Sequence, residues 1–324
     1  MQPSLGTGSQ LQGREDGSVK LLKRVLACGA TLAALSAPAH AQNNADQVSS
    51  VSLIAEASEV HPGQTILIGL RFELEDHWHI YWDGRNDTGF APMIDWDLPD
   101  GVRVGPLLWP APSRYVSPGN ILDHVYEGTP TILTMLTVDP DVAPGTSLEI
   151  KGQVEWLVCN DVCLPGFGPV SLELTTAPKV LSSPEQLEPL SPDAPIGRSA
   201  SKLPVPLTAQ TKPAGLSLRW GEDIVTVEYQ DATSLAFYPM LASVSLVSTL
   251  EDAKAEGSKL ALRLAAPEDD LSSSDERRLV GVLAATTDEG AVWYLIDFGS
   301  DGLRQPADAE LISHVRARVE RRPS

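Results

Sequence analysis

Cysteine, positive charge and long apolar segments are all scarce in this 324-residue chain. It contains three cysteines, 24 lysine and arginine residues, and 43 aspartate and glutamate residues, which give a formal net charge of -19. Because nucleic-acid phosphates are bound by basic surfaces, this charge argues against a nucleic-acid partner. We interpret the acidity as a contribution to solubility. After residue 41 no segment approaches about 18 consecutive apolar residues, so the mature protein is expected to be soluble.

Several catalytic motifs are also absent from the sequence. No glycine-rich phosphate loop follows a predicted strand, and neither the G-x-S-x-G motif of hydrolases nor the H-E-x-x-H motif of zinc peptidases occurs. The sequence therefore indicates neither a dinucleotide-binding fold nor a hydrolase, and we expect no cofactor.

The N-terminal region has the features of a secretory signal peptide. Lys20, Lys23 and Arg24 precede the apolar run VLACGATLAALSA, and an A-x-A sequence ends at Ala41. A basic start, a short apolar segment and small residues at the cleavage site are typical of export signals. We therefore predict that residues 1–41 are a signal peptide that is cleaved, which places the mature chain in the periplasm.

The three cysteines divide between this predicted signal and the mature chain. Cys28 follows a loose lipobox, but the apolar run lies mostly after it, which disfavours lipid attachment. Cleavage leaves Cys159 and Cys163 as a pair in an exported protein, where disulfide chemistry is the first expectation.

The mature chain has the pattern of an all-β protein in two parts. Short runs rich in β-branched and aromatic residues alternate with Pro-Gly and Asp-Gly turn signals over residues 42–176, which predicts a β-sandwich. Residues 177–215 are rich in proline and predict a linker. Strand-like runs resume over residues 216–324 and predict a second β-rich domain without cysteine. Its final segment, AELISHVRARVERR, has one apolar face and predicts a C-terminal helix.

The cysteine pair permits three interpretations. VEWLV precedes it and favours a strand, so Cys159 and Cys163 would face each other across a three-residue turn, with Cβ atoms about 4.5–5.5 Å apart. A disulfide closing so short a loop would stabilise the fold by roughly 2 kcal/mol, less than a long-range bridge. The pair is therefore better suited to reversible redox exchange. A structural bridge and a metal site are the alternatives.

A few histidines could serve as additional ligands if the cysteine pair bound a metal ion. His77 and His79 alternate on a predicted strand and would point to one face, while His124 stands alone. Thiolates and imidazoles together suit copper or zinc. The sequence lacks the second half of a zinc motif, so we assign no metal site and keep His77 and His79 as the weaker alternative ligands.

Four segments resemble the periplasmic N-terminal domain of the thiol:disulfide interchange protein DsbD, in the form found in ScsB-like proteins. They are HWHIYWDGRNDTGFAPMIDWDLPDGV, LLWPAPSRY, VYEGTPTILTML and VEWLVCNDVCLPG, and the strong part of the resemblance covers residues 50–175. The family resemblance implies an immunoglobulin-like β-sandwich with the redox pair near one end.

The resemblance also implies roles for particular residues. Cys159 would be the attacked and attacking sulfur, and Cys163 its resolving partner. In the family a loop caps the pair until a partner arrives, and residues 120–128 correspond to that loop. Asp123 and Tyr126 match the cap positions, and Asp123 is a candidate for assisting proton movement.

The family further implies the partners of the protein. A membrane-embedded DsbD- or CcdA-like electron donor would reduce the pair, and periplasmic thioredoxin-like or disulfide-containing client proteins would oxidise it again. Because the chain has no polytopic domain of its own, we expect this donor to be a separate polypeptide. The alternative function is a non-catalytic periplasmic module that binds copper or an assembly partner.

Overall fold

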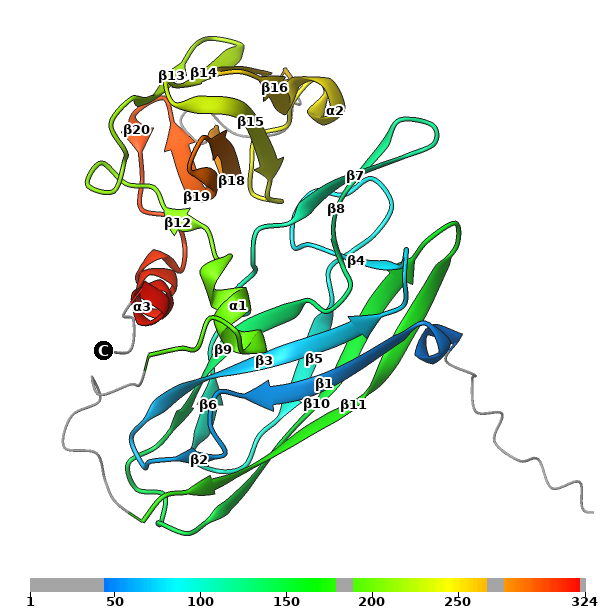
Figure 1. Cartoon of the computed structure of the whole chain (residues 1–324), viewed down its shortest axis with the longest axis vertical. Helices are drawn as coiled ribbons and strands as arrows, with labels where there is room; N and C mark the ends of the chain where they lie inside the picture. Colours follow the sequence, from blue (N-terminus) through cyan, green and yellow to red (C-terminus); the bar gives the residue numbers. More distant parts are fainter. Residues whose placement is uncertain (1–43, 179–188, 267–276, 321–324) are drawn as a thin grey trace, which may run out of the picture. The chain divides into compact units, whose positions relative to one another are not determined.

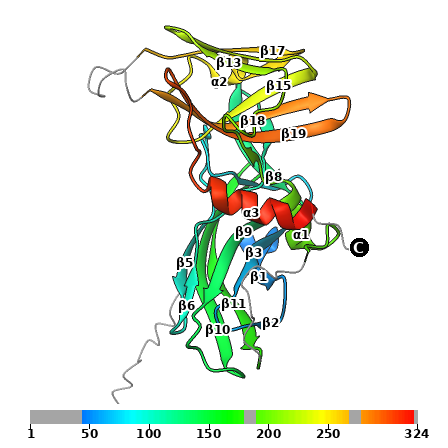
Figure 2. The same cartoon turned by 90° about the vertical axis from the view of Figure 1, so that its left-hand side faces the viewer.

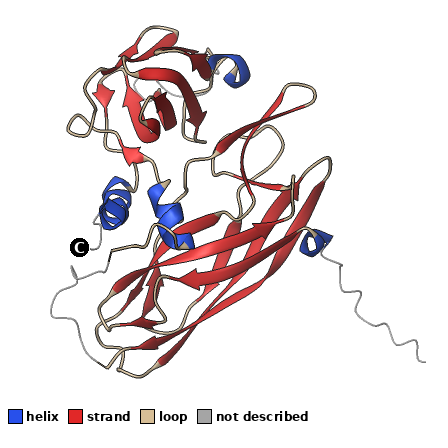
Figure 3. Cartoon of the chain, viewed as in Figure 1, coloured by secondary structure: helices blue, strands red, loops and turns tan. Residues whose placement is uncertain are grey.

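Strands make up most of the computed structural model, which describes residues 44–178, 189–266 and 277–320 (Figure 3). The predicted signal peptide lies outside these ranges and stays a prediction. Residues 42–324 group as one compact unit. In the described part of the chain, no helix is both long enough and apolar enough to cross a membrane.

Two sheets of the N-terminal part pack face to face as a β-sandwich (Figure 1). The first has the strand order β1 (Ser49–Ala55), β3 (Thr65–Leu74), β9 (Thr131–Val138), β6 (Val102–Val104). The second has the order β2 (Glu59–Val60), β11 (Cys163–Thr176), β10 (Ser147–Cys159), β4 (His79–Tyr81), β8 (Ile121–Glu127), β7 (Ser113–Ser117), and β5 (Met93–Asp97) also pairs with β10. This architecture confirms the predicted all-β, immunoglobulin-like fold.

The long hairpin of β10 and β11 carries the cysteine pair at its turn. Residues of β10 alternate between buried and exposed, as expected for a strand with one face on the core. Trp156 lies on the buried face and donates a hydrogen bond from Nε1 to Ser49 Oγ at 3.0 Å. A Cβ atom at Gly166, opposite Trp156, would lie 2.1 Å from the indole. The Pro-Gly sequence after the cysteines therefore leaves room for the core tryptophan.

The C-terminal part adds two further sheets with a separate apolar core. One has the order β12 (Val205–Pro206), β19 (Gly290–Gly299), β18 (Arg278–Thr287), β15 (Ala232–Pro239), β16 (Lys254–Glu256), with β20 (Gly302–Leu303) beside β19. The other has the order β13 (Leu216–Trp220), β14 (Ile224–Tyr229), β17 (Lys259–Arg263). The sequence predicted a β-rich structure here.

Short helices join and flank these sheets: η1 (Asn44–Gln47), α1 (Pro195–Ser201), α2 (Thr249–Asp252) and α3 (Ala309–Glu320). Helix α3 corresponds to the predicted C-terminal helix, and Figure 2 shows it near α1. Arg318 of α3 is buried and forms a bidentate ion pair with Glu56, with nitrogen–oxygen distances of 3.1 and 2.6 Å. This pair ties the last helix to the end of β1.

Candidate functional site

A disulfide closes the turn between β10 and β11. Cys159 ends one strand, Cys163 begins the next, and the two are direct partners in the antiparallel register with a Cα–Cα distance of 4.1 Å. Their accessibility differs strongly, because Cys159 is 1% exposed whereas Cys163 belongs to the exposed turn. A partner thiolate therefore reaches Cys163 more easily than Cys159.

The buried sulfur of Cys159 has an aromatic and apolar surrounding. Cys159 belongs to a small core cluster with Tyr81 and Val125, against which Tyr115 packs. On its other side, Cys159 pairs in register with His79 of β4. The His79 ring stacks against Tyr115 with a centroid distance of 4.5 Å. His79 is buried, and its Nδ1 atom has no hydrogen-bond partner among the described residues.

A chain of hydroxyl groups connects the second sulfur to a buried carboxylate. The Tyr81 hydroxyl lies 3.7 Å from Cys163 Sγ and 3.1 Å from Thr88 Oγ1. Thr88 Oγ1 in turn donates to Asp123 Oδ2 at 2.6 Å. Asp123 is 2% exposed, and its Oδ1 accepts the backbone N–H groups of Asp87 and Thr88. Three hydrogen bonds thus fix this carboxylate at the end of the chain.

The proton positions in this chain follow from the number of hydrogens that each group carries. Thr88 has one hydroxyl proton and gives it to Asp123, so in its bond with Tyr81 the threonine oxygen accepts. The tyrosine proton then points toward Thr88, and its oxygen faces Cys163 Sγ as an acceptor. A reduced Cys163 thiol can donate into this chain, which leads to the Asp123 carboxylate.

Burial changes the acid–base properties of two groups around the pair. It raises the pKa of Tyr81 above its ordinary value, with a smaller raising effect from the charge of Asp123. Burial also lowers the pKa of His79, and the carboxylates of Asp123 and Glu127 partly oppose this. Tyr81 and His79 are therefore both favoured in their neutral forms at neutral pH.

The prediction that residues 120–128 form a loop over the cysteine pair is wrong. Residues Ile121–Glu127 form strand β8 of the second sheet, which is paired on both sides, with β4 and with the edge strand β7. Tyr126 does not lie over the disulfide: it is 8% exposed, belongs to the sandwich core, and donates its hydroxyl to Pro110 O. Asp123 does approach the pair, but from the buried side and through Thr88 and Tyr81.

The arrangement that the sequence predicted for His77 and His79 is also wrong. His77 is an exposed turn residue before β4 with a φ of 70°, whereas His79 is buried within the strand. They do not share the face of one strand, because the strand begins at His79. In the described ranges, no group of three or more histidine, cysteine, aspartate or glutamate side chains is placed to hold a metal ion.

His124 serves the packing of the sandwich against the C-terminal part. It is buried, its ring lies 5.2 Å from that of Tyr238, and its Nδ1 is 2.7 Å from Arg85 O. Burial lowers the pKa of His124 to about 4, although the hydrogen bond to Arg85 raises it. A neutral imidazole in this setting is a structural group of the core.

The comparisons with known proteins agree with this geometry. The family described as "Thiol:disulfide interchange protein DsbD, N-terminal" matches residues 50–174, a segment that contains both cysteines, His79, Tyr81, Thr88 and Asp123. The matched family is one of thiol–disulfide interchange domains, and the matched segment holds the two cysteines of the disulfide at the strand turn. Residues 50–174 are a domain of the DsbD N-terminal family, as the sequence resemblance predicted.

The solved structures extend the fold comparison beyond this segment. The N-terminal periplasmic domain of ScsB from Proteus mirabilis aligns over 79% of this chain and 95% of its own, with 16% identity and a TM-score of 0.51. This similarity concerns the fold and includes the C-terminal part. The periplasmic chaperone SfaE aligns over 75% of this chain and 99% of its own at 8% identity, and its TM-score of 0.21 is too low to indicate a shared fold. No curated protein sequence matches the chain.

Sequence reasoning missed two members of the site. Tyr81 lies two positions after His79, so the period of a strand could have placed both side chains on one face beside the cysteines. Thr88 lies in an irregular loop and contacts Asp123 across 35 residues of sequence. No local pattern marks such a contact in advance.

Proposed function

We propose that this protein is a periplasmic thiol–disulfide exchange protein that relays reducing equivalents from a membrane-embedded donor to oxidised client proteins through Cys159 and Cys163. One observation carries the proposal: a disulfide at an exposed turn lies beside a hydroxyl chain that ends on a buried carboxylate. Membership of residues 50–174 in the interchange family supports the same function.

Reduction of the pair begins at the exposed sulfur. A donor thiolate attacks Cys163 Sγ, a donor–Cys163 disulfide forms, and the Cys159–Cys163 bond breaks with its electron pair on Cys159. A second donor thiol then attacks the donor's own sulfur in the mixed disulfide and releases Cys163. The donor leaves oxidised, and both cysteines of this protein are reduced.

Oxidation by a client reverses these steps. The Cys163 thiolate attacks the client disulfide and forms a mixed disulfide, and one client sulfur leaves as a thiolate. Cys159 then attacks Cys163 Sγ, re-forms the internal bridge and releases the second client sulfur. This order is the reverse of the one that the family resemblance implied, because the burial of Cys159 suits an internal resolving sulfur better than a first point of attack.

Neighbouring side chains accept and donate the protons that these steps require. When Cys163 becomes a thiolate, its proton passes to Tyr81, the tyrosine proton to Thr88, and the threonine proton to Asp123. After this shift the Tyr81 hydroxyl donates to the thiolate and stabilises it. His79 pairs in register with Cys159, so its imidazole is a candidate for exchanging a proton with that sulfur.

Trapping of mixed disulfides tests both the function and the order of the sulfurs. We expect Cys159→Ser to retain a partner covalently on Cys163, because the resolving sulfur is gone. Cys163→Ser serves as the matched control and should retain little, because Cys159 is buried. Retention by Cys163→Ser alone would contradict the assigned order.

The reduction potential of the pair tests the function independently of any partner. We expect a value within the range of exchange proteins, above about -300 mV. A potential far below that figure would identify the disulfide as a structural bridge and would contradict the proposal.

The copper-binding alternative has no comparable support. It depended on His77 and His79 lying on one face near the cysteines, and His77 lies instead in an exposed turn. His79 pairs in register with Cys159, and a single imidazole beside the disulfide does not make a copper site.

A further inference from the structure

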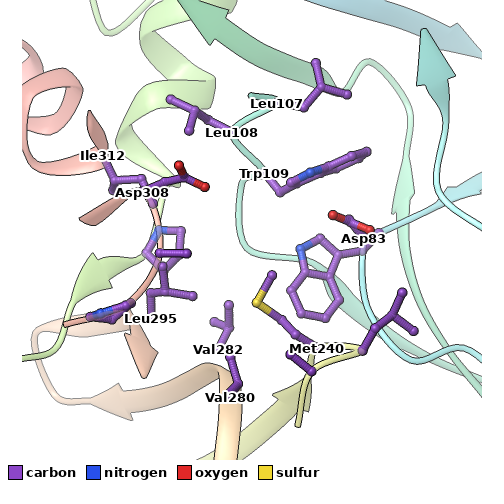
Figure 4. A pocket seen from close by; sticks show the side chains of 16 residues that line it. Asp83, Leu107, Leu108, Trp109, Met240, Val280, Val282, Leu295, Asp308 and Ile312 are labelled. Atoms are coloured by element: carbon purple, nitrogen blue, oxygen red, sulfur yellow. The ribbon is translucent and has the colours of Figure 1, made fainter. Parts of the chain in front are cut away.

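Beside the loop that follows β4, the structure contains an apolar cavity of about 290 Å³ (Figure 4). It lies where this loop, the segment before β7, the loop after β15, and the start of α3 meet. Apolar side chains form most of its wall, including Trp82, Leu108, Trp109, Met240, Val282 and Ile312. The cavity opens into a wider groove of about 900 Å³, with which it shares Asp83, Leu107, Trp109, Met240, Leu241 and Asp308.

Large apolar side chains are exposed along this groove. Phe90, Met93 and Leu241 line the wider part and are 49%, 55% and 71% exposed. Exposed apolar surface that gathers in one concave region marks an interaction site more often than scattered residues do. Phe90 follows Thr88 by two residues in the same loop, so the groove begins next to the hydroxyl chain of the redox site.

The charged residues that line the groove are three aspartates, Asp83, Asp87 and Asp308, and one cation, Arg85. Asp83 and Asp308 project from opposite walls (Figure 4), and neither forms an ion pair or a side-chain hydrogen bond within the described part of the chain. Arg85 lies in the same loop as Asp83, but its guanidinium donates to Met240 O and Ser245 Oγ. It is therefore held by the C-terminal part and does not neutralise the aspartates.

These features together select for a positive charge flanked by apolar groups. Asp83 is half-buried beside two indole rings, and burial raises its pKa, so a cation next to it would relieve an unfavourable desolvation. Tryptophan faces also attract lysine and arginine through cation–π interactions. The open groove of about 900 Å³ suits an extended polypeptide better than a small molecule, which needs a more enclosing pocket.

We propose that this groove binds an extended segment of a partner protein in which a lysine or arginine stands next to large apolar side chains. The proposal rests on the proposed function, because it names how an electron donor or a client is held while its sulfur reaches Cys163. The positive charge sits between Asp83 and Asp308, and the apolar side chains cover Trp109 and Leu241.

A cysteine-free peptide separates this binding from redox chemistry. The probe is the fluorescein-labelled peptide GSLKFSG, compared with its charge-reversed form GSLEFSG and its polar form GSSKSSG, titrated by fluorescence polarisation into the full chain with its disulfide intact. We expect GSLKFSG to bind best. Asp83→Asn and Asp308→Asn should each weaken it about fivefold, as loss of a partly exposed ion pair does.

Matched apolar variants test the remaining contacts. Leu241→Ser should weaken binding about tenfold, because burial of its side chain against the peptide is lost. Val247→Ser is the control, since Val247 is 57% exposed but lines neither the cavity nor the groove. It should leave binding unchanged.

Several results would overturn the proposal. They are equal binding of GSLKFSG and GSLEFSG, absence of binding by any of the three peptides, or equal effects of Leu241→Ser and Val247→Ser. Self-association that Leu241→Ser abolishes would show that a second copy covers the groove, which also overturns it. The rate at which dithiothreitol reduces the Cys159–Cys163 disulfide is measured in parallel for the wild type and the groove variants. The rates should be equal. Failure of partner trapping alongside intact peptide binding would refute the redox function and leave the groove assignment standing.

Discussion

Replacement of Tyr81 by phenylalanine isolates the contribution of one hydroxyl group to the chemistry of the pair. The change removes the oxygen that lies 3.7 Å from Cys163 Sγ and keeps the ring that packs on Cys159. Hydrogen bonds to charged groups contribute about 1.5–3 kcal/mol, and the length of this one places it near the lower end. About 1.4 kcal/mol corresponds to a factor of ten in the thiolate population.

The alkylation rate of reduced Cys163 measures this effect. In a Cys28→Ser/Cys159→Ser background only Cys163 can react, so iodoacetamide rates over a pH series report its thiolate alone. We expect Tyr81→Phe to slow alkylation about tenfold at neutral pH and to raise the midpoint of the pH profile by about one unit. Thr88→Val should act in the same direction but less strongly, because the Tyr81 hydroxyl remains beside the sulfur.

A structural control distinguishes the hydroxyl chain from general packing. Tyr115 contacts the ring of His79 in the same cluster, but no hydrogen bond joins its hydroxyl to either sulfur within the described residues. Tyr115→Phe should therefore leave the pH profile unchanged. An unchanged midpoint in Tyr81→Phe, or an equal shift in both variants, would refute the proton path.

Three further predictions concern the stability of the fold and are tested by urea unfolding. Gly166→Ala should destabilise by about 1–3 kcal/mol, because the new Cβ would overlap Trp156. Gly168→Ala is its control, with no atom within 4 Å of the added carbon, and should cost less than about 0.5 kcal/mol. Arg318→Met should cost about 3–5 kcal/mol by leaving a buried carboxylate unpaired. The low pKa of His124, about 4 against 6.5 in an unfolded chain, favours proton uptake by the unfolded state between these values. The free energy of unfolding should therefore decrease by roughly 3 kcal/mol as the pH falls from about 6.5 to 4. His124→Phe should remove this part of the pH dependence.

The amino-acid sequence determined the elements that depend on local pattern. The strand-like segment VEWLV before Cys159 and the three-residue spacing of the cysteines were enough to predict strands that bring Cys159 and Cys163 opposite each other, as the register shows. The apolar face of α3 predicted the last helix in the same way. The four segments that resemble the DsbD N-terminal domain predicted the correct family for residues 50–174. The division into residues 42–176 and 216–324 as separate domains stays a prediction.

Only the tertiary structure decided which polar groups serve the sulfurs. Residues 120–128 resembled a cap, but most of them form strand β8, which is paired on both sides. Tyr126 therefore lies in the core, and Asp123 lies on the buried side of the pair. His77 and His79 differ by only two positions, but the strand begins at His79 and leaves His77 in the turn before it. The path from Cys163 through Tyr81 and Thr88 to Asp123 joins residues up to 82 positions apart. Side-chain periodicity is a local property of the backbone, whereas such a path depends on how separate strands and a loop pack, and the sequence alone does not specify that packing.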